Sequence, residues 1–196
     1  MRWRMLILMA SARLALGLQF QTLASTSEYL ILDFALNYTQ IGTLIGLFML
    51  PGLVLAIPAG MLGRYASDRM LVAFGLGLLS LGGFIAALAD GYNQIAVGRL
   101  FCGAGFVFST IYFTKMVADW FSGREIATAL SILVMTWPLG IAIGQVGHEW
   151  LSANLGWHTA FVTASAYGVI AMTAVAVFYR APMAKADDAA LPAWSL

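Results

Sequence analysis

Charged residues are scarce in this 196-residue chain. Asp, Glu, Lys and Arg make up 10% of it, whereas soluble domains carry about 25%. Hydrophobic residues reach 61% and the mean hydropathy is +0.86. A soluble fold of this size cannot hide so much apolar surface, because a large part of any small domain faces water. The composition therefore predicts an integral membrane protein whose first partner is the lipid bilayer.

The chain also lacks the residues on which several other functions depend. Its one cysteine, Cys102, excludes an intrachain disulfide and any multi-cysteine metal centre. No G-x-S-x-G, H-E-x-x-H or Walker-type glycine loop is present, so the sequence predicts no enzyme, no cofactor and no bound metal. A net charge of +1 without any Lys/Arg run gives no basic field for nucleic acid.

Long apolar stretches, by contrast, are abundant. A helix needs about 20 mostly apolar residues to cross a bilayer, and six stretches qualify: 5–34, 40–63, 69–89, 92–117, 124–151 and 157–179. The short segments between them make neighbouring helices antiparallel. A membrane β-barrel would instead show segments of about 10 residues that alternate in polarity. We predict an all-α polytopic bundle of six transmembrane helices over residues 1–180. Residues 181–196 would form a cytoplasmic tail or the start of a linker.

The basic residues predict the orientation of this bundle. Those outside the span interiors all fall on one side of an alternating topology: Arg2, Arg4, Arg64, Arg69, Lys115, Arg124, Arg180 and Lys185. Connections on the other side contain no Lys or Arg. Cytoplasmic loops of membrane proteins carry the excess of basic residues. Both termini are therefore expected on the cytoplasmic side of a bacterial inner membrane.

Small residues and prolines inside the spans predict close packing and bending. Glycines on shared helix faces let backbones approach in lipid: Gly103, Gly105, Gly140 and Gly144. Prolines within spans two and five are expected to bend them: Pro51, Pro58 and Pro138. These features either serve packing alone or shape a central cavity and permit rocking. The long first span predicts a tilt, a kink or an extension into the headgroups.

Polar residues inside the spans are candidates for a solute or ion pathway, because charge in the bilayer is costly and usually faces a cavity. Helical geometry places Gln21 and Glu28 near one face of the first span, with Ser25 beside them and Arg13 within about 80°. Arg99 lies at a depth comparable to that of Glu28. We predict that Arg99 pairs with Glu28 or attracts an anionic solute. The alternatives are that Arg13 extends to the membrane surface and Glu28 lies at the interface.

A charged turn separates the second and third spans, in the stretch AIPAGMLGRYASDRM, residues 56–70. Arg64 and Asp68 are four residues apart, so a helical turn would bring them together, as a solvated surface pair or as a brace. The turn resembles the G-x-x-x-D-[RK]-x-G-[RK]-[RK] pattern of the N-terminal half of major facilitator superfamily transporters. Gly60 and Arg69 match its first and last positions. Arg64 stands where the pattern has aspartate, and Asp68 where it has a basic residue.

Three other stretches carry the same resemblance. GRLFCGAG fits R-x-x-x-G-x-G through Arg99, Gly103 and Gly105, and ADWFSGREIATALSI resembles the turn between helices four and five. TWPLGIAIG is similar to the glycine–proline stretch of helix five, with Trp137 where a glycine usually precedes the proline. Within the superfamily, the sequence looks most similar to cyanate/nitrate-type porters.

The resemblance implies one half of a transporter fold, built as a 3+3 helix repeat. It implies secondary active transport of a small solute by alternating access, with a coupling proton or ion, and a turn that braces the inward- and outward-facing states. Such transporters have two six-helix halves. We therefore expect a truncated product, a fragment that lacks its C-terminal half, or a half-transporter that forms a homodimer. The alternatives are a six-helix channel and a membrane assembly or interaction protein.

Overall fold

The computed structural model describes residues 2–182, and over this range its regular structure is entirely helical. Its elements are α1 (Arg2–Ser25), α2 (Ser27–Phe34), α3 (Tyr38–Leu47), α4 (Leu50–Leu62), α5 (Asp68–Ala87), α6 (Tyr92–Trp120), α7 (Arg124–Leu155) and α8 (Trp157–Phe178). The six predicted spans are confirmed, the second being α3 and α4 together. Of the predicted tail, residues 181–196, only residues 181 and 182 are among the described residues.

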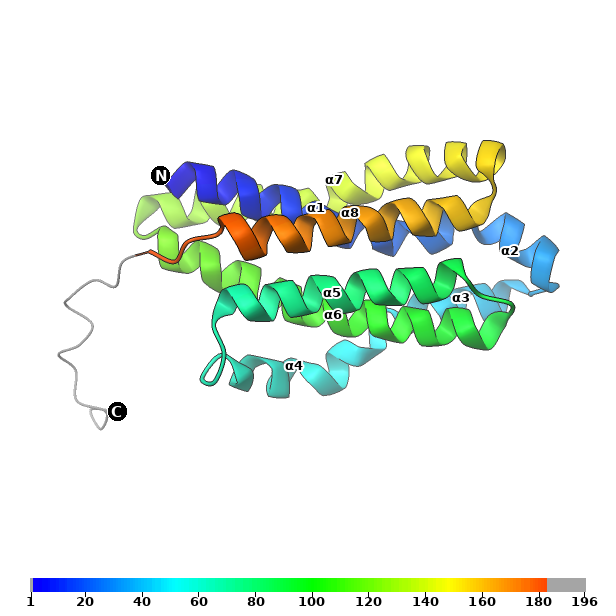
Figure 1. Ribbon diagram of the computed structural model, residues 1–196, viewed down its shortest axis with the longest axis horizontal. Helices are drawn as coiled ribbons and strands as arrows, with labels where there is room; N and C mark the ends of the chain where they lie inside the picture. Colours follow the sequence, from blue (N-terminus) through cyan, green and yellow to red (C-terminus); the bar gives the residue numbers. More distant parts are fainter. Residues whose placement is uncertain (1, 183–196) are drawn as a thin grey trace.

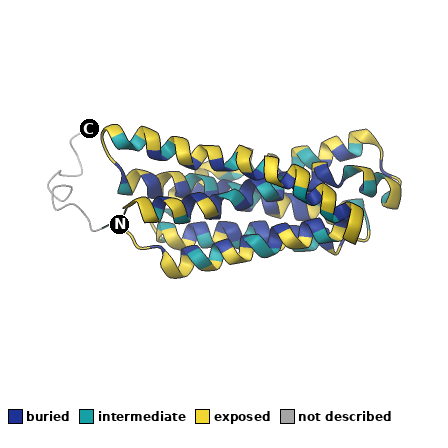
Figure 2. Cartoon of the chain, turned by 90° about the horizontal axis from the view of Figure 1, so that it is seen from above, coloured by how far each residue is buried: buried dark blue, intermediate teal, exposed yellow. Residues whose placement is uncertain are grey.

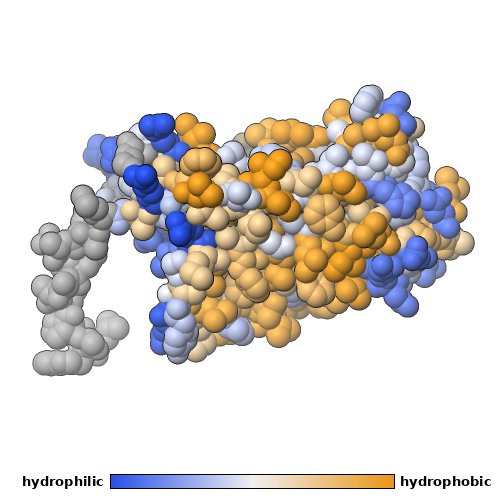
Figure 3. Space-filling view, in the orientation of Figure 1, coloured by the Kyte–Doolittle hydropathy of each residue, from blue (hydrophilic) through white to orange (hydrophobic). Residues whose placement is uncertain are grey.

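The helices run along the long axis of one bundle (Figure 1). One end, here called the terminal end, holds the start of α1, the end of α8 and the α4–α5 and α6–α7 turns. The far end holds α2 and the α5–α6 and α7–α8 turns. Figure 3 shows apolar side chains across the middle of the visible face and hydrophilic ones towards both ends. This distribution matches an apolar band between two polar membrane surfaces.

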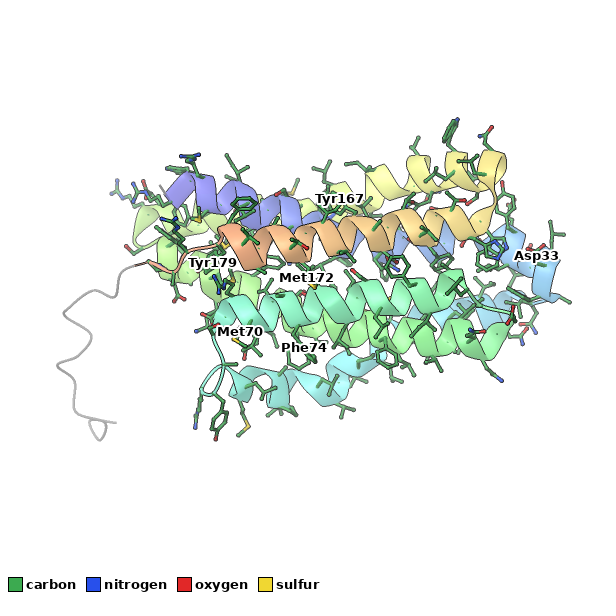
Figure 4. All side chains as sticks on the ribbon, viewed as in Figure 1. Asp33, Met70, Phe74, Tyr167, Met172 and Tyr179 are labelled. Carbon is green, nitrogen blue, oxygen red and sulfur yellow. The ribbon has the colours of Figure 1, made fainter. Side chains whose placement is uncertain are left out.

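The first span contains a kink, one of the outcomes that its length predicts. The helix is interrupted at Thr26, whose hydroxyl donates to the Thr22 carbonyl oxygen at 2.9 Å. The Thr22 hydroxyl in turn donates to the Leu18 carbonyl oxygen at 3.0 Å. Serine and threonine hydroxyls that bond back to the preceding turn often bend helices. At the far end, Trp157 Nε1 donates to Asp33 Oδ2 at 2.6 Å and so connects α8 with α2; Figure 4 labels Asp33 there.

The second span is broken between α3 and α4. Pro51 has no amide hydrogen, so it cannot continue the hydrogen-bond ladder of α3. The Phe48 and Met49 amides bond three residues back, to Ile45 and Gly46, at 3.3 and 2.9 Å. Pro58 and Pro138, by contrast, lie inside the helices α4 and α7, neither of which is divided. The proline nearest the end of α3 therefore divides its span.

Glycines allow the closest helix contacts in the bundle. A Cβ atom added at Gly105 would lie 2.5 Å from the Leu79 amide nitrogen on α5, and one at Gly103 would lie 2.9 Å from the Pro51 ring. Gly140 faces α1, where an added Cβ would lie 2.6 Å from the Leu14 carbonyl oxygen. Buried residues line the helix sides that face one another (Figure 2). Backbone contact therefore fixes how α6 meets α5 and how α7 meets α1.

Replacing Gly105→Ala should destabilise the bundle, because the added methyl group must displace the backbone of α5. Overpacking of this kind costs about 1–3 kcal/mol. The matched control is Gly42→Ala, since no atom lies within 4 Å of a Cβ added there. Thermal unfolding in detergent should show a lowered midpoint for Gly105→Ala alone. Equal midpoints for the two variants would contradict the packing described for α5 and α6.

Candidate solute pathway

Arg99 lies at the junction of three helices and is 0% exposed. Its Nε donates to the Leu44 carbonyl oxygen of α3 at 3.3 Å. Nη1 and Nη2 donate to the Gln19 and Phe20 carbonyl oxygens of α1 at 3.1 and 3.4 Å. The guanidinium carbon also lies 4.6 Å from the centroid of the Phe48 ring. One side chain of α6 thus connects α1 with α3.

The break in the second span supplies one of these acceptors. In a continuous helix the Phe48 amide would donate to the Leu44 carbonyl oxygen. Here it donates to the Ile45 carbonyl oxygen, so the Leu44 oxygen is open to another donor. Carbonyl groups at a helix C-terminus lack intrahelical donors and carry partial negative charge. A buried guanidinium is a favourable partner for such a group. The division of α3 from α4 and the burial of Arg99 therefore support each other.

The predicted pair between Arg99 and Glu28 is not formed. Glu28 lies on α2 and is exposed, and within residues 2–182 Arg99 makes no salt bridge. The helical projection assumed one continuous helix, whereas the first span is interrupted at Thr26. The Arg99 nitrogens are directed to backbone carbonyl groups instead.

Arg13 is also buried, at 7% exposure, and does not extend to the membrane surface. Its Nη1 donates to the Leu133 carbonyl oxygen of α7 at 2.6 Å. The Thr136 hydroxyl donates to the same oxygen at 2.6 Å. Arg13 therefore connects α1 with α7 as Arg99 connects α1 with α6 and α3.

Gln21 and Ser25 meet α7 nearer the far end. Gln21 Nε2 donates to Gln145 Oε1 and, at 3.3 Å, to the Ser25 hydroxyl. The Ser25 hydroxyl lies 3.5 Å from the Gly144 carbonyl oxygen. A Cβ atom added at Gly144 would lie 3.1 Å from Gln21 Cβ, so the glycine lets the two polar side chains reach α7. Sequence reasoning missed Gln145, although it directly follows Gly144.

The charges of the interior are of one sign. In the part of the chain that the structure describes, the buried charged side chains are Arg13 and Arg99, and every Asp and Glu is at least partly exposed. The salt bridges of that same part, Arg2–Glu125 at 2.8 Å and Lys115–Asp68 at 2.6 Å, lie at the terminal end. The bundle therefore buries two guanidinium groups without a buried carboxylate to balance them.

The charged turn lies at the terminal end, between α4 and α5. Asp68 is the first residue of α5, and both its carboxylate oxygens accept from Lys115 Nζ of α6, at 2.6 and 2.7 Å. Arg64 is exposed and makes no salt bridge with Asp68, because residues 63–67 form a turn rather than the helix that the spacing assumed. Gly60 has open space on its exposed side. The structure thus pairs Asp68 with Lys115 in place of Arg64.

A cavity of about 500 Å³ adjoins this salt bridge. It is lined by residues of the α4–α5 turn, of the start of α5, of α6 and of the segment after α8, among them Arg69, Asp119 and Tyr179. Burial raises the pKa of Tyr179 to about 12, so its phenol is neutral at ordinary pH. Figure 4 shows Tyr179 at this end of the bundle.

The fold of this chain also occurs in solved structures of membrane transporters. A bacterial homologue of the human lysosomal transporter Spinster, in an inward-facing and unoccupied conformation, superposes with a TM-score of 0.80 over 93% of this chain and 44% of its own, at 17% identity. The chain thus has the fold of a membrane transporter's six-helix half. A sequence profile of the Major Facilitator Superfamily matches residues 9–193, and the chain belongs to that superfamily.

Three curated relatives are similar in sequence. YbcL of Bacillus subtilis (strain 168), an uncharacterized MFS-type transporter, is 29% identical over 84% of this chain and 44% of its own length. The "Probable L-galactonate transporter" of Escherichia coli (strain K12) is 22% identical over 76% of this chain and 33% of its own. The nitrate/nitrite transporter NrtP of Picosynechococcus sp. is 36% identical over 51% and 18%. The chain spans less than half of each relative.

A double-mutant cycle should distinguish the two possible partners of Asp68. Asp68→Asn and Lys115→Gln should show a coupling of about 0.5–1 kcal/mol, because Lys115 is half exposed and solvent weakens the pair. Asp68→Asn and Arg64→Gln should show none, since Arg64 makes no salt bridge with Asp68. Thermal unfolding in detergent measures both cycles. A larger coupling in the Arg64 cycle would contradict the observed pairing.

Proposed function

We propose that the chain is one half of a secondary active transporter that moves a small anionic solute by alternating access, together with a second six-helix bundle. The observation that carries this proposal is the burial of Arg13 and Arg99, with no buried carboxylate among residues 2–182. An unbalanced buried charge costs several kcal/mol. A solute anion, held in the space between two bundles, would offset part of that cost each time it binds.

The names of two relatives support an anion as the solute. One is named for L-galactonate, whose acid group is a carboxylate, and another for nitrate and nitrite. The match to the nitrate/nitrite transporter also agrees with the proposed cyanate/nitrate-type subfamily. Organic and inorganic anions share the negative charge that the interior of this bundle favours. Coupling to a proton or another ion is part of the proposal.

The second bundle would cover faces that this half leaves open. In α4 the buried residue is Ala59, while Leu53, Val54 and Ile57 are each more than 70% exposed. On α7, Met135 and Val146 are exposed as well. The partner would be the C-terminal half of a longer chain or a second copy of this one. With both termini in the cytoplasm, the Lys115–Asp68 salt bridge would brace α5 and α6 at the cytoplasmic surface as the halves rock.

Transport by the purified chain in liposomes tests this proposal. We expect saturable uptake of radiolabelled nitrate or L-galactonate under an inward proton gradient. Arg99→Gln should reduce uptake about tenfold, which corresponds to about 1.4 kcal/mol. Arg124→Gln, at the exposed start of α7, is the matched control and should change uptake less than twofold. Circular dichroism verifies that each variant is folded.

Three outcomes would overturn the proposal. Discrete single-channel currents in planar bilayers would assign the chain to the channels. If a folded Arg99→Gln variant took up solute as fast as the wild-type chain, the buried charge of Arg99 would have no role in transport. A folded chain that moves neither anion, alone or with a C-terminal half supplied in trans, would favour a membrane interaction protein.

A further inference from the structure

Four aromatic side chains from four segments form a closed set, here called the aromatic quartet. Its members are Phe20 of α1, Phe48 at the α3–α4 break, Phe106 of α6 and Trp137 of α7. Successive ring centroids are 5.2, 5.4, 5.9 and 5.7 Å apart around the set. These separations are typical of directly interacting aromatic pairs. The ring planes of these pairs are tilted by 49° to 78°, so the quartet is a cluster of tilted and edge-to-face rings that joins α1, α6 and α7 to the break.

The quartet has a covered part and an open part. Phe48 is fully buried, and the Arg99 guanidinium lies 4.6 Å from its centroid and 6.0 Å from that of Phe20. Phe20, Phe106 and Trp137 remain partly exposed. A buried cation thus lies against the quartet, while three of its members remain accessible from outside the bundle.

One hydrogen-bond donor of the quartet has no acceptor. Trp137 Nε1 is buried and unpartnered within residues 2–182. A buried indole N–H usually finds an acceptor, and leaving it without one is unfavourable. Trp137 also stands at the position where the related transporters usually have glycine before the proline. The tryptophan therefore adds a partly exposed π face to the quartet, together with an N–H group that the structure buries.

We propose that the exposed part of the quartet is the solute-contacting surface, and that the solute is an organic anion with a flat, unsaturated body. This inference rests on the proposed function and narrows its solute class. The flat body would stack on the exposed part of one ring, Phe106 or Trp137, and contact the edge of the other, because the two ring planes are tilted by 49°. Arg99 would contribute its charge through space, because its three nitrogens already bond to carbonyl groups. An inorganic anion such as nitrate would be attracted by the charge of Arg99. It would not stack on the rings, and it would find no free N–H group on the guanidinium.

Four probes separate the contributions of charge and π surface. Benzoate has both, cyclohexanecarboxylate and nitrate lack an aromatic body, and benzyl alcohol lacks the charge. Binding of each to the purified chain in lipid nanodiscs is measured by equilibrium dialysis. We expect benzoate to bind about tenfold more tightly than each of the other three, a ratio that corresponds to about 1.4 kcal/mol.

Variants locate the binding surface. Phe106→Leu and Trp137→Leu should each weaken benzoate binding about tenfold, while nitrate binding should change less than twofold. Trp137→Phe keeps an aromatic ring at this position and should therefore weaken benzoate binding less than Trp137→Leu does. The control is Phe74→Leu, which removes a comparable aromatic pair, since Phe74 and Phe108 lie 5.3 Å apart. Phe74 of α5 and Met172 of α8, both labelled in Figure 4, line a groove whose lining includes no member of the quartet. This control should change benzoate binding less than twofold.

The outcomes separate this inference from the proposed function. Equal affinities for the three anions, or benzoate binding that the quartet variants leave unchanged, would overturn the inference and leave an anionic solute standing. Preference for benzyl alcohol over every anion would overturn both. If the folded chain binds none of the probes, the quartet is a packing cluster and the inference is wrong. Circular dichroism and the wild-type-like behaviour of Phe74→Leu verify folding.

Discussion

A buried guanidinium bound to backbone carbonyl groups is the interaction on which the rest of this bundle depends. In lipid no water can satisfy an open carbonyl group, so each break in a helix needs a donor from the protein. Arg99 provides that donor to Leu44 at the end of α3. The same side chain bonds to two carbonyl groups of α1. Without it, the broken second span would leave a polar group unpaired inside the membrane.

The way Arg99 is held explains the character of the interior. Carbonyl oxygens stabilise the cation without neutralising it, and Arg13 is held in the same manner by Leu133. The charges that do form salt bridges, such as Lys115 with Asp68, lie at the terminal end. Two buried cations and paired charges at one end are the arrangement on which the proposed transport of an anion rests. The middle of the face seen in Figure 3 is apolar.

Much of the fold could be predicted from the sequence, because composition and span length depend only on residue type. Six spans and their antiparallel order follow from apolar runs and their lengths, whereas the length of the first span left a tilt, a kink and an extension into the headgroups all open. The partners of the charged residues could not be predicted. Pairing Arg99 with Glu28 assumed an unbroken helix through Thr26, and pairing Arg64 with Asp68 assumed a helix where a turn occurs. The true acceptors of Arg99 are backbone oxygens, which no side-chain pattern reveals.

The quartet illustrates a second limit of sequence reasoning. Its members are spread from Phe20 to Trp137, so only the packing of α1, α6 and α7 around the break brings them together. Trp137 could be noticed as a departure from the family pattern, but not as a neighbour of Phe20. Long-range contacts of this kind depend on how glycines such as Gly103 and Gly140 allow the helices to approach.

Amide hydrogen exchange of Arg99→Met, compared with the wild-type chain in lipid nanodiscs, tests the central role of Arg99 most directly. If Arg99 holds the α3–α4 break, exchange at the Phe48 and Met49 amides should accelerate by about tenfold, because local opening there becomes easier. Exchange within α5 (Asp68–Ala87) should be unchanged. An exchange rate at the break that is the same in both proteins would contradict the account, and so would a uniform increase along the whole chain.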